Sequence, residues 1–324
     1  MRKVWIALIC LGVLAHAFSL AVLPDSAYSD SAVHIRNSVE FNLTSIYYII
    51  PSLIYMFVPA VFPFTKIMPA IATALLLLTG YLLLKQEFGK NYIIPFALLA
   101  SLPWLIRYGS VNYLGVLGAA FLMGALYLKQ KKDLDSFAIV WLCLLFTKVN
   151  AALVGIFICV PEKLRRNSFY GFLGVFLAAM LFLDIPGSLL SILDFPPVGA
   201  FIRFEMLAGV SYLGAALLFS LMVLPMGLVA LKGLLQTRES LYAQAFMFLF
   251  AVFALGGVFW RGDTMLLYVR WLIPVLPFIS IFYMRGLSET KGWFRDMAIL
   301  STVLYCFYSY SMTAISAMVY AGVL

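Results

Sequence analysis

The residues best suited to chemistry lie in one stretch, residues 24–40, directly after the first apolar run. This stretch contains Asp25, Asp30, His34 and Arg36 in a chain of which only 11% of the residues are charged. A carboxylate partly withdrawn from water can take a proton from a hydroxyl group or bind a divalent cation. An imidazole four residues further along a helix can share either task. The stretch therefore predicts acid–base or metal chemistry at a membrane surface.

A short helix is expected to position these groups. Ser29 or Asp30 is a suitable N-cap, and on the helix that follows Asp30 and His34 share one face. Arg36 and Glu40 form a separate pair at a spacing of four. A helix cap and a surface salt bridge would explain the same pattern without catalysis. The residue types leave both interpretations open.

Asp25 and the metal question remain open as well. Asp25 is either a second acidic candidate or a turn residue after Pro24. Asp30 and His34 are the candidate ligands for a divalent cation such as Mg²⁺ or Mn²⁺. The first loop has no adjacent pair of acids, so both metal-dependent and metal-free catalysis are consistent with it.

The elements around these residues must be membrane helices. The chain has 324 residues, of which 64% are hydrophobic, and a mean hydropathy of +1.02, whereas soluble domains carry about 25% charged residues. Apolar runs of about 17–25 residues indicate spanning helices. We expect about eleven spans, near residues 4–23, 67–84, 92–106, 113–128, 136–147, 149–160, 169–184, 209–231, 241–259, 265–284 and 297–318. The runs 136–147 and 149–160 are too short to cross about 30 Å and are expected to be half-helices or tilted segments.

Charge predicts the topology. The run 46–64, which contains Pro51, Pro59 and Pro63, is interpreted as a helix at the outer interface. Counting it as a span would reverse the predicted side of the membrane for every later loop. Most of the basic residues then lie on the side of Arg2, which the positive-inside rule makes cytoplasmic. The basic residues placed against this bias are Arg36, Lys66, Arg107, Lys148, Arg203, Arg261 and Arg270. Anion binding is the reason we expect for them.

Three of these cations are the strongest candidates for binding a substrate. Lys148, between the two short spans, should face water, a carboxylate or a phosphate, although an interfacial lysine is equally consistent. Arg270 lies inside a late span, where its planar fork suits either a phosphate or a buried pair with Asp263. Arg203, in the outer loop 185–208, could reach a lipid head group or merely anchor the loop.

The sequence also excludes several common functions. It contains no GxSxG, HExxH or Walker sequence, which excludes the usual hydrolase, metalloprotease and ATPase chemistries. The four cysteines lie inside apolar runs without metal-ligand spacing. The net charge of +8 is explained by topology, so no nucleic-acid partner is expected.

The order of these features resembles the GT-C glycosyltransferases, which use lipid-phosphate sugar donors. The string from Asp30 to Arg36 is similar to the acidic first-loop motif of archaeal oligosaccharyltransferase catalytic subunits and of protein O-mannosyltransferase-like enzymes. Three strings further along are also similar to features of this family. Ile50–Tyr55 resembles its proline-rich segment, Phe146-Thr147-Lys148 resembles its threonine-lysine pair between central helices, and Arg270–Pro277 resembles its arginine-to-proline run in a late helix. The resemblance implies that Asp30 is the catalytic or metal-positioning acid and that Lys148 and Arg270 contact the donor phosphate. Protein N-glycosylation is not expected, because the chain lacks a WWDYG-type motif and ends soon after its last span.

These observations lead to one overall prediction. The chain is expected to be an all-α, GT-C-like bundle of about eleven spans forming a single transmembrane domain over 1–324, with outer loops at 24–66, carrying short interfacial helices, and at 185–208. It would sit in the plasma membrane with a cytoplasmic N-terminus and an extracytoplasmic site. That site would move a sugar from a polyprenyl-phosphate donor, for instance dolichyl phosphate, to a lipid, glycan or protein acceptor. Asp30 would be catalytic, and the substrate-binding residues would be Asp25, His34, Arg36, Lys148, Arg203 and Arg270. A transporter or flippase for an anionic lipid-linked substrate, or a non-catalytic assembly subunit, is the alternative.

Overall fold

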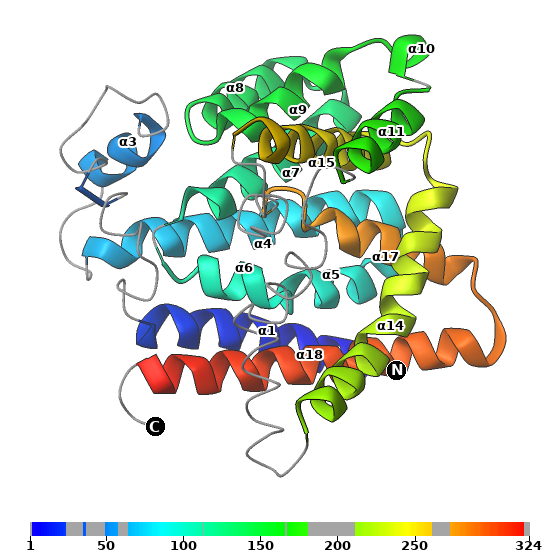
Figure 1. Cartoon of the computed structure of the whole chain (residues 1–324). Coiled ribbons are helices and arrows are strands. Elements are labelled where there is room, and N and C mark those ends of the chain that lie inside the picture. The colour runs from blue at the N-terminus through cyan, green and yellow to red at the C-terminus, as the bar shows by residue number, and fades with distance from the viewer. Residues whose placement is uncertain are drawn as a thin grey trace. The chain divides into compact units, whose positions relative to one another are not determined.

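The computed structural model describes residues 2–23, 35–36, 49–57, 64–111, 113–165, 167–180, 211–260 and 273–320. Every regular element within these ranges is a helix, which confirms the all-α class (Figure 1). The chain divides into two compact units, Met1–Ile156 together with Thr313–Leu324, and Phe157–Met312. Each unit is described by itself.

The first unit contains most of the chain's N-terminal half. Its helices are α1 (Arg2–Val22), α3 (Ile49–Phe57), α4 (Ile67–Phe88), α5 (Ile93–Ala100), α6 (Pro103–Tyr108), α7 (Leu114–Lys131), α8 (Leu134–Leu145) and most of α9 (Val149–Cys159). The second unit contains α10 (Glu162–Arg165), α11 (Ser168–Met180), α14 (Tyr212–Gln236), α15 (Leu241–Trp260), α17 (Phe278–Ser288) and most of α18 (Gly292–Tyr320).

Helices α4 and α7 form the centre of the first unit and run in the same direction. Thr79 lies against Gly124, and eight residues further along α4 the side chain of Glu87 accepts a hydrogen bond from Gln130 of α7. Helix α5 folds back on α4 after a turn at Gly89. The φ of Gly89 is +54°, in the left-handed region that glycine tolerates. The 107–113 turn between α6 and α7 therefore lies at the end of the unit where α4 begins.

Helix α1 packs against α5 and α6 and presents two different faces. Trp5, Leu8 and Gly12 are buried, whereas Leu14 on the other face is 62% exposed. A helix that is apolar on both faces and buried on only one suits a lipid-facing position at the edge of a membrane bundle.

Helices α8 and α9 form a hairpin. The indole Nε1 of Trp141 donates a hydrogen bond to the carbonyl of Ala152 at 3.1 Å, and the same indole covers Gly155. The chain therefore reverses at Thr147 and Lys148, and neither arm is long enough to cross a bilayer, since α8 has 12 residues and α9 has 11. The prediction of two short segments at 136–160 is confirmed.

The second unit is built around close helix contacts. Gly233 of α14 and Gly286 of α17 lie so close that a methyl group at either would overlap the other helix's backbone. The Ser301 hydroxyl of α18 donates to the carbonyl of Met222 in α14. Aromatic rings join α11 to α15, with Phe172 and Phe248 at 5.2 Å.

The described helices are those of an integral membrane protein. Three helical stretches, Arg2–Val22, Ile67–Ala100 and Gly292–Ile315, are long and apolar enough to cross a membrane. The pair Ser220–Gln236 and Leu241–Val252, bent by 107°, is a broken span or a re-entrant loop. The nine-residue helix α3 falls in the run expected to lie at the outer interface, and it is too short to cross. The total of about eleven spans remains a prediction.

Candidate functional site

The turn at residues 107–113 gathers contacts from the other elements of the first unit. It begins in the last residues of α6 and is described at residues 107–111 and 113; α6 itself begins with Pro103 at its first position, where a missing N–H costs nothing. Its backbone carbonyls accept hydrogen bonds from α4, and its last residue, Tyr113, lies beneath a lysine of the α8–α9 hairpin. We take this turn as the centre of the candidate site.

Lys66, immediately before α4, is a buried cation that contacts this turn. Its side chain is 9% exposed, and its ammonium donates to the carbonyl of Leu23 at 2.6 Å and to that of Ser110 at 3.1 Å. The first carbonyl belongs to the end of α1, where the last carbonyl groups of a helix have no partner within the helix. Lys66 therefore joins the ends of α1 and α6 to the start of α4.

A second tie from α4 reaches the same turn. The Thr73 hydroxyl donates to the carbonyl of Gly109 at 2.9 Å, and both residues are buried. A Cβ at Gly109 would fall 2.5 Å from that hydroxyl oxygen, so glycine is required here by space and not by its backbone angles. The Ser110 hydroxyl donates to the carbonyl of Ile106 at 2.7 Å and closes the turn.

Lys148 lies at the tip of the α8–α9 hairpin and enters the site from the other side. Its ammonium is 5.2 Å from the ring centroid of Tyr113, and that ring lies 5.0 Å from the ring of Tyr108. The side-chain stem packs on Gly118, where an added Cβ would lie 3.0 Å from the lysine Cβ. Lys148 is half-buried, and its ammonium lies over an aromatic ring, which stabilises the cation electrostatically.

The carboxylates in the described part of the first unit are confined to one of its ends. Lys66 and Lys148 lie at the end where α4 and α7 begin, and Arg107 belongs to the turn itself. The carboxylates in the described part of this unit are Glu87, Asp133 and Asp135, at the end where α4 and α7 finish. The described side chains at the end where α4 and α7 begin therefore carry a net positive charge, which favours anions.

The structure tests only part of the predicted constellation. Asp25, Asp30, His34, Arg203 and Arg270 lie outside the described residues, as do Arg261 and Asp263. Arg36 falls in a short helical segment and has an exposed side chain. Among the described residues there is no group of three His, Cys, Asp or Glu side chains that could hold a metal ion.

The sequence prediction did not place two residues that the structure makes central among the substrate-binding residues. Lys66 was grouped with the cations placed against topological bias, yet it bonds to backbone carbonyls. Tyr113 had no distinguishing sequence signal, because an aromatic residue at the start of an apolar helix is common at membrane interfaces. The 107–113 turn joins Lys66 to the tyrosine pair and to Lys148.

Comparison with known proteins assigns no relatives. No protein family, no curated protein and no solved structure matches this chain.

Proposed function

We propose that this protein is a GT-C-type membrane glycosyltransferase that moves a sugar from a polyprenyl-phosphate donor to a lipid, glycan or protein acceptor. The proposal places it in the plasma membrane as a bundle of about eleven spans. The N-terminus would be cytoplasmic, and the 107–113 turn would face the extracytoplasmic side, together with the first loop that carries Asp30.

The observation that carries this proposal is the position of Lys148. A lysine inside an apolar chain is costly, about 2.5–3.5 kcal/mol on a helix facing the middle of the bilayer, unless it serves a polar partner. Here the ammonium is held at the tip of a helix hairpin, half-buried, and supported by the Tyr113 ring. A cation presented in this way suits the phosphate of a lipid whose chain remains in the membrane.

The proposed reaction assigns each group one task. Asp30 takes the proton of the acceptor hydroxyl, and the acceptor oxygen then bonds to the anomeric carbon of the sugar. The bond from that carbon to the phosphate oxygen breaks, and its electron pair leaves with the polyprenyl phosphate. Lys148, together with Arg270, neutralises the charge that develops on this departing phosphate. Arg36, His34, Asp25 and Arg203 would bind the remaining parts of donor and acceptor, and His34 would join Asp30 if a divalent cation takes part.

The test is a transfer assay with purified protein and radiolabelled polyprenyl-phosphate sugars, scoring both sugar transfer and sugar release. Asp30→Asn should abolish both products, and Lys148→Met should weaken donor binding about tenfold or more, since a charge-assisted contact is lost. Lys90→Met is the matched control, because Lys90 is exposed at the far end of the first unit.

Three results would separate the alternatives. Undiminished turnover in Asp30→Asn removes the assignment of the catalytic acid. Donor movement between leaflets without release of sugar identifies a flippase. Failure of the wild-type chain both to bind and to process any donor would leave an assembly subunit as the better explanation.

A further inference from the structure

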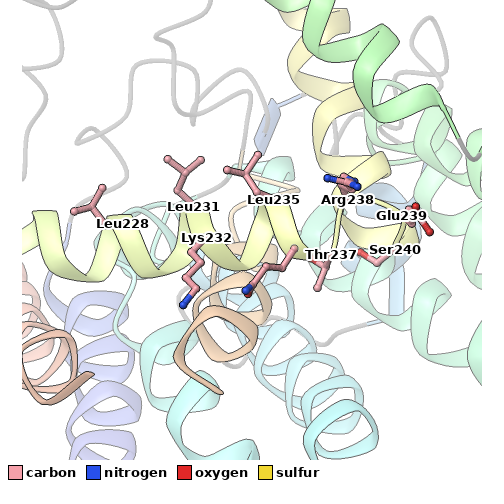
Figure 2. A pocket seen from close by; sticks show the side chains of 9 residues that line it. Leu228, Leu231, Lys232, Leu235, Thr237, Arg238, Glu239 and Ser240 are labelled. Carbon is pink, nitrogen blue, oxygen red and sulfur yellow. The ribbon is translucent and has the colours of Figure 1, made fainter. Parts of the chain in front are cut away.

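One face of α14 in the second unit carries a regular row of exposed leucines. They are Leu217, Leu221, Leu224, Leu228, Leu231 and Leu235, with spacings that alternate between four and three. Their exposure runs from 44% at Leu228 to 65% at Leu221. Arg238 occupies the next position of the same series, just beyond the helix end (Figure 2). We call this row, ending in Arg238, the leucine–arginine stripe.

This row is not the face by which α14 packs in its own unit. The packing face contains Met226, which is buried, and Val229 and Gly233, which approach α17 closely. In Figure 2 the side chains of Leu228, Leu231 and Leu235 point to one side of the helix and that of Lys232 points to the other. The leucines therefore take no part in the described packing of α14 within the second unit.

The stripe ends in an open groove with a polar end. The groove has a volume of about 850 Å³, and it is lined by Leu228, Leu231 and Leu235 on its apolar side and by residues 236–240 at its end. Lys232 and Arg238 contribute two positive charges and Glu239 one negative charge, so the lining is net cationic. An apolar wall that leads to a polar end carrying an arginine is the pattern of an anionic amphiphile site.

The Arg238 guanidinium is presented for binding. Its central carbon lies 5.6 Å from the ring centroid of Tyr170, so the ring covers one face of the group. Stacking on a ring leaves the in-plane N–H donors available, and their fork geometry matches two oxygens of a phosphate. Lys232 is engaged within the protein. Its ammonium donates a hydrogen bond to the Glu289 carbonyl at 2.9 Å and so joins α14 to the turn between α17 and α18.

The length of the apolar wall fits a single leaflet. Leu228 precedes Arg238 by ten residues, which corresponds to about 15 Å along a helix. Half of a hydrocarbon core of about 30 Å is also about 15 Å. A lipid whose phosphate reaches Arg238 would therefore lay its acyl chain along Leu235, Leu231 and Leu228.

A second copy of this chain fits the stripe less well. Alternation of four and three is also the spacing of a coiled-coil seam. Two copies inserted in the same orientation that met in parallel along α14 would bring each Arg238 against its own counterpart, and like charges at a seam destabilise it. In lipid, moreover, helices lack the hydrophobic drive that joins leucine faces in water.

We propose that the leucine–arginine stripe binds one anionic glycerophospholipid, with the acyl chain on the leucines and the phosphate at Arg238. By the positive-inside rule this lipid belongs to the cytoplasmic leaflet. The proposal does not depend on glycosyl transfer, because it concerns a different unit and a lipid of the surrounding membrane.

The test is native mass spectrometry of the full chain in detergent, titrated with phosphatidylglycerol or phosphatidylcholine of the same acyl composition. Phosphatidylglycerol should bind more tightly, and Arg238→Gln should weaken it about tenfold. Arg295→Gln, which removes an exposed arginine of α18 outside the groove, should leave both affinities unchanged. Glu239→Gln should tighten phosphatidylglycerol binding about two- to fivefold, a gain that misfolding cannot produce.

The apolar half needs its own variant. Leu231→Asn should weaken both lipids, and inorganic phosphate should fail to displace phosphatidylglycerol. Equal effects of Arg238→Gln and Arg295→Gln, or no effect of either, would overturn the proposal. So would displacement by inorganic phosphate alone, or a dimer that Leu231→Asn dissociates while lipid binding stays the same.

Discussion

Replacing Lys66 with methionine should destabilise the first unit, because this buried cation joins three elements. Methionine keeps the length and the apolar stem and removes the ammonium. The carbonyls of Leu23 and Ser110 then lose donors at 2.6 Å and 3.1 Å, in a place where the lysine side chain is only 9% exposed. Water is poorly placed to replace these donors.

The magnitude follows from the two hydrogen bonds. A hydrogen bond that involves a charged group contributes about 1.5–3 kcal/mol, so two such bonds contribute about 3–6 kcal/mol. The removed desolvation cost of the buried ammonium offsets part of this lost stabilisation. We expect the free energy of unfolding to fall by about 2–4 kcal/mol.

The assay is reversible unfolding in mixed micelles, followed by circular dichroism, with Lys85→Met as the control. Lys85 lies at the other end of the same helix, is exposed, and bonds through its ammonium to the Tyr81 hydroxyl at 2.8 Å. Its replacement should change the unfolding free energy by less than about 0.5 kcal/mol. A Lys66→Met protein as stable as the wild type would refute the structural role argued for this lysine.

Two further substitutions test the packing of each unit. Gly233→Ala should destabilise the second unit by several kcal/mol, on the order of 3, since the new methyl group overlaps the Phe282 carbonyl. Gly227→Ala is the control: it lies in the same helix with open space around it, and in the same thermal unfolding measurement it should stabilise slightly, by up to about 1 kcal/mol. His16→Leu should stabilise the first unit by about 1–3 kcal/mol, because the buried imidazole near the Ala100 carbonyl has neither nitrogen in a hydrogen bond of normal geometry. A loss of stability in that variant would show instead that His16 holds a polar partner.

Much of the architecture could be predicted from the chain alone, because a bilayer permits few solutions. Apolar runs in a chain with 11% charge must become helices, and the two runs at 136–160 are too short to cross whatever surrounds them. The break at Thr147 and Lys148 was predictable for the same reason. The proposed role of the leucine–arginine stripe could not be predicted from the sequence. A repeat of leucines in an apolar helix does not show whether that face of the helix is buried or exposed.

The candidate site divides in the same way. Residue type and topological bias were enough to select Lys148 as a cation that needs a partner, because a lysine is expensive anywhere in an apolar chain. They selected Lys66 as well, but they could not show that its ammonium donates hydrogen bonds to backbone carbonyls of two other elements. The functions of Asp30 and Arg270 stay predictions from the sequence.

By itself, then, the sequence determined the class of the molecule, the positions of its helices and the cations that needed an explanation, because these depend on local apolarity and on the energy of charge in lipid. Only the tertiary structure decided that Lys66 donates hydrogen bonds to backbone carbonyls, that the Lys148 ammonium lies over the Tyr113 ring, and that one row of α14 leucines is exposed. These are contacts between residues from about 35 to more than 40 positions apart, or exposures set by a neighbouring helix, and no local pattern encodes them.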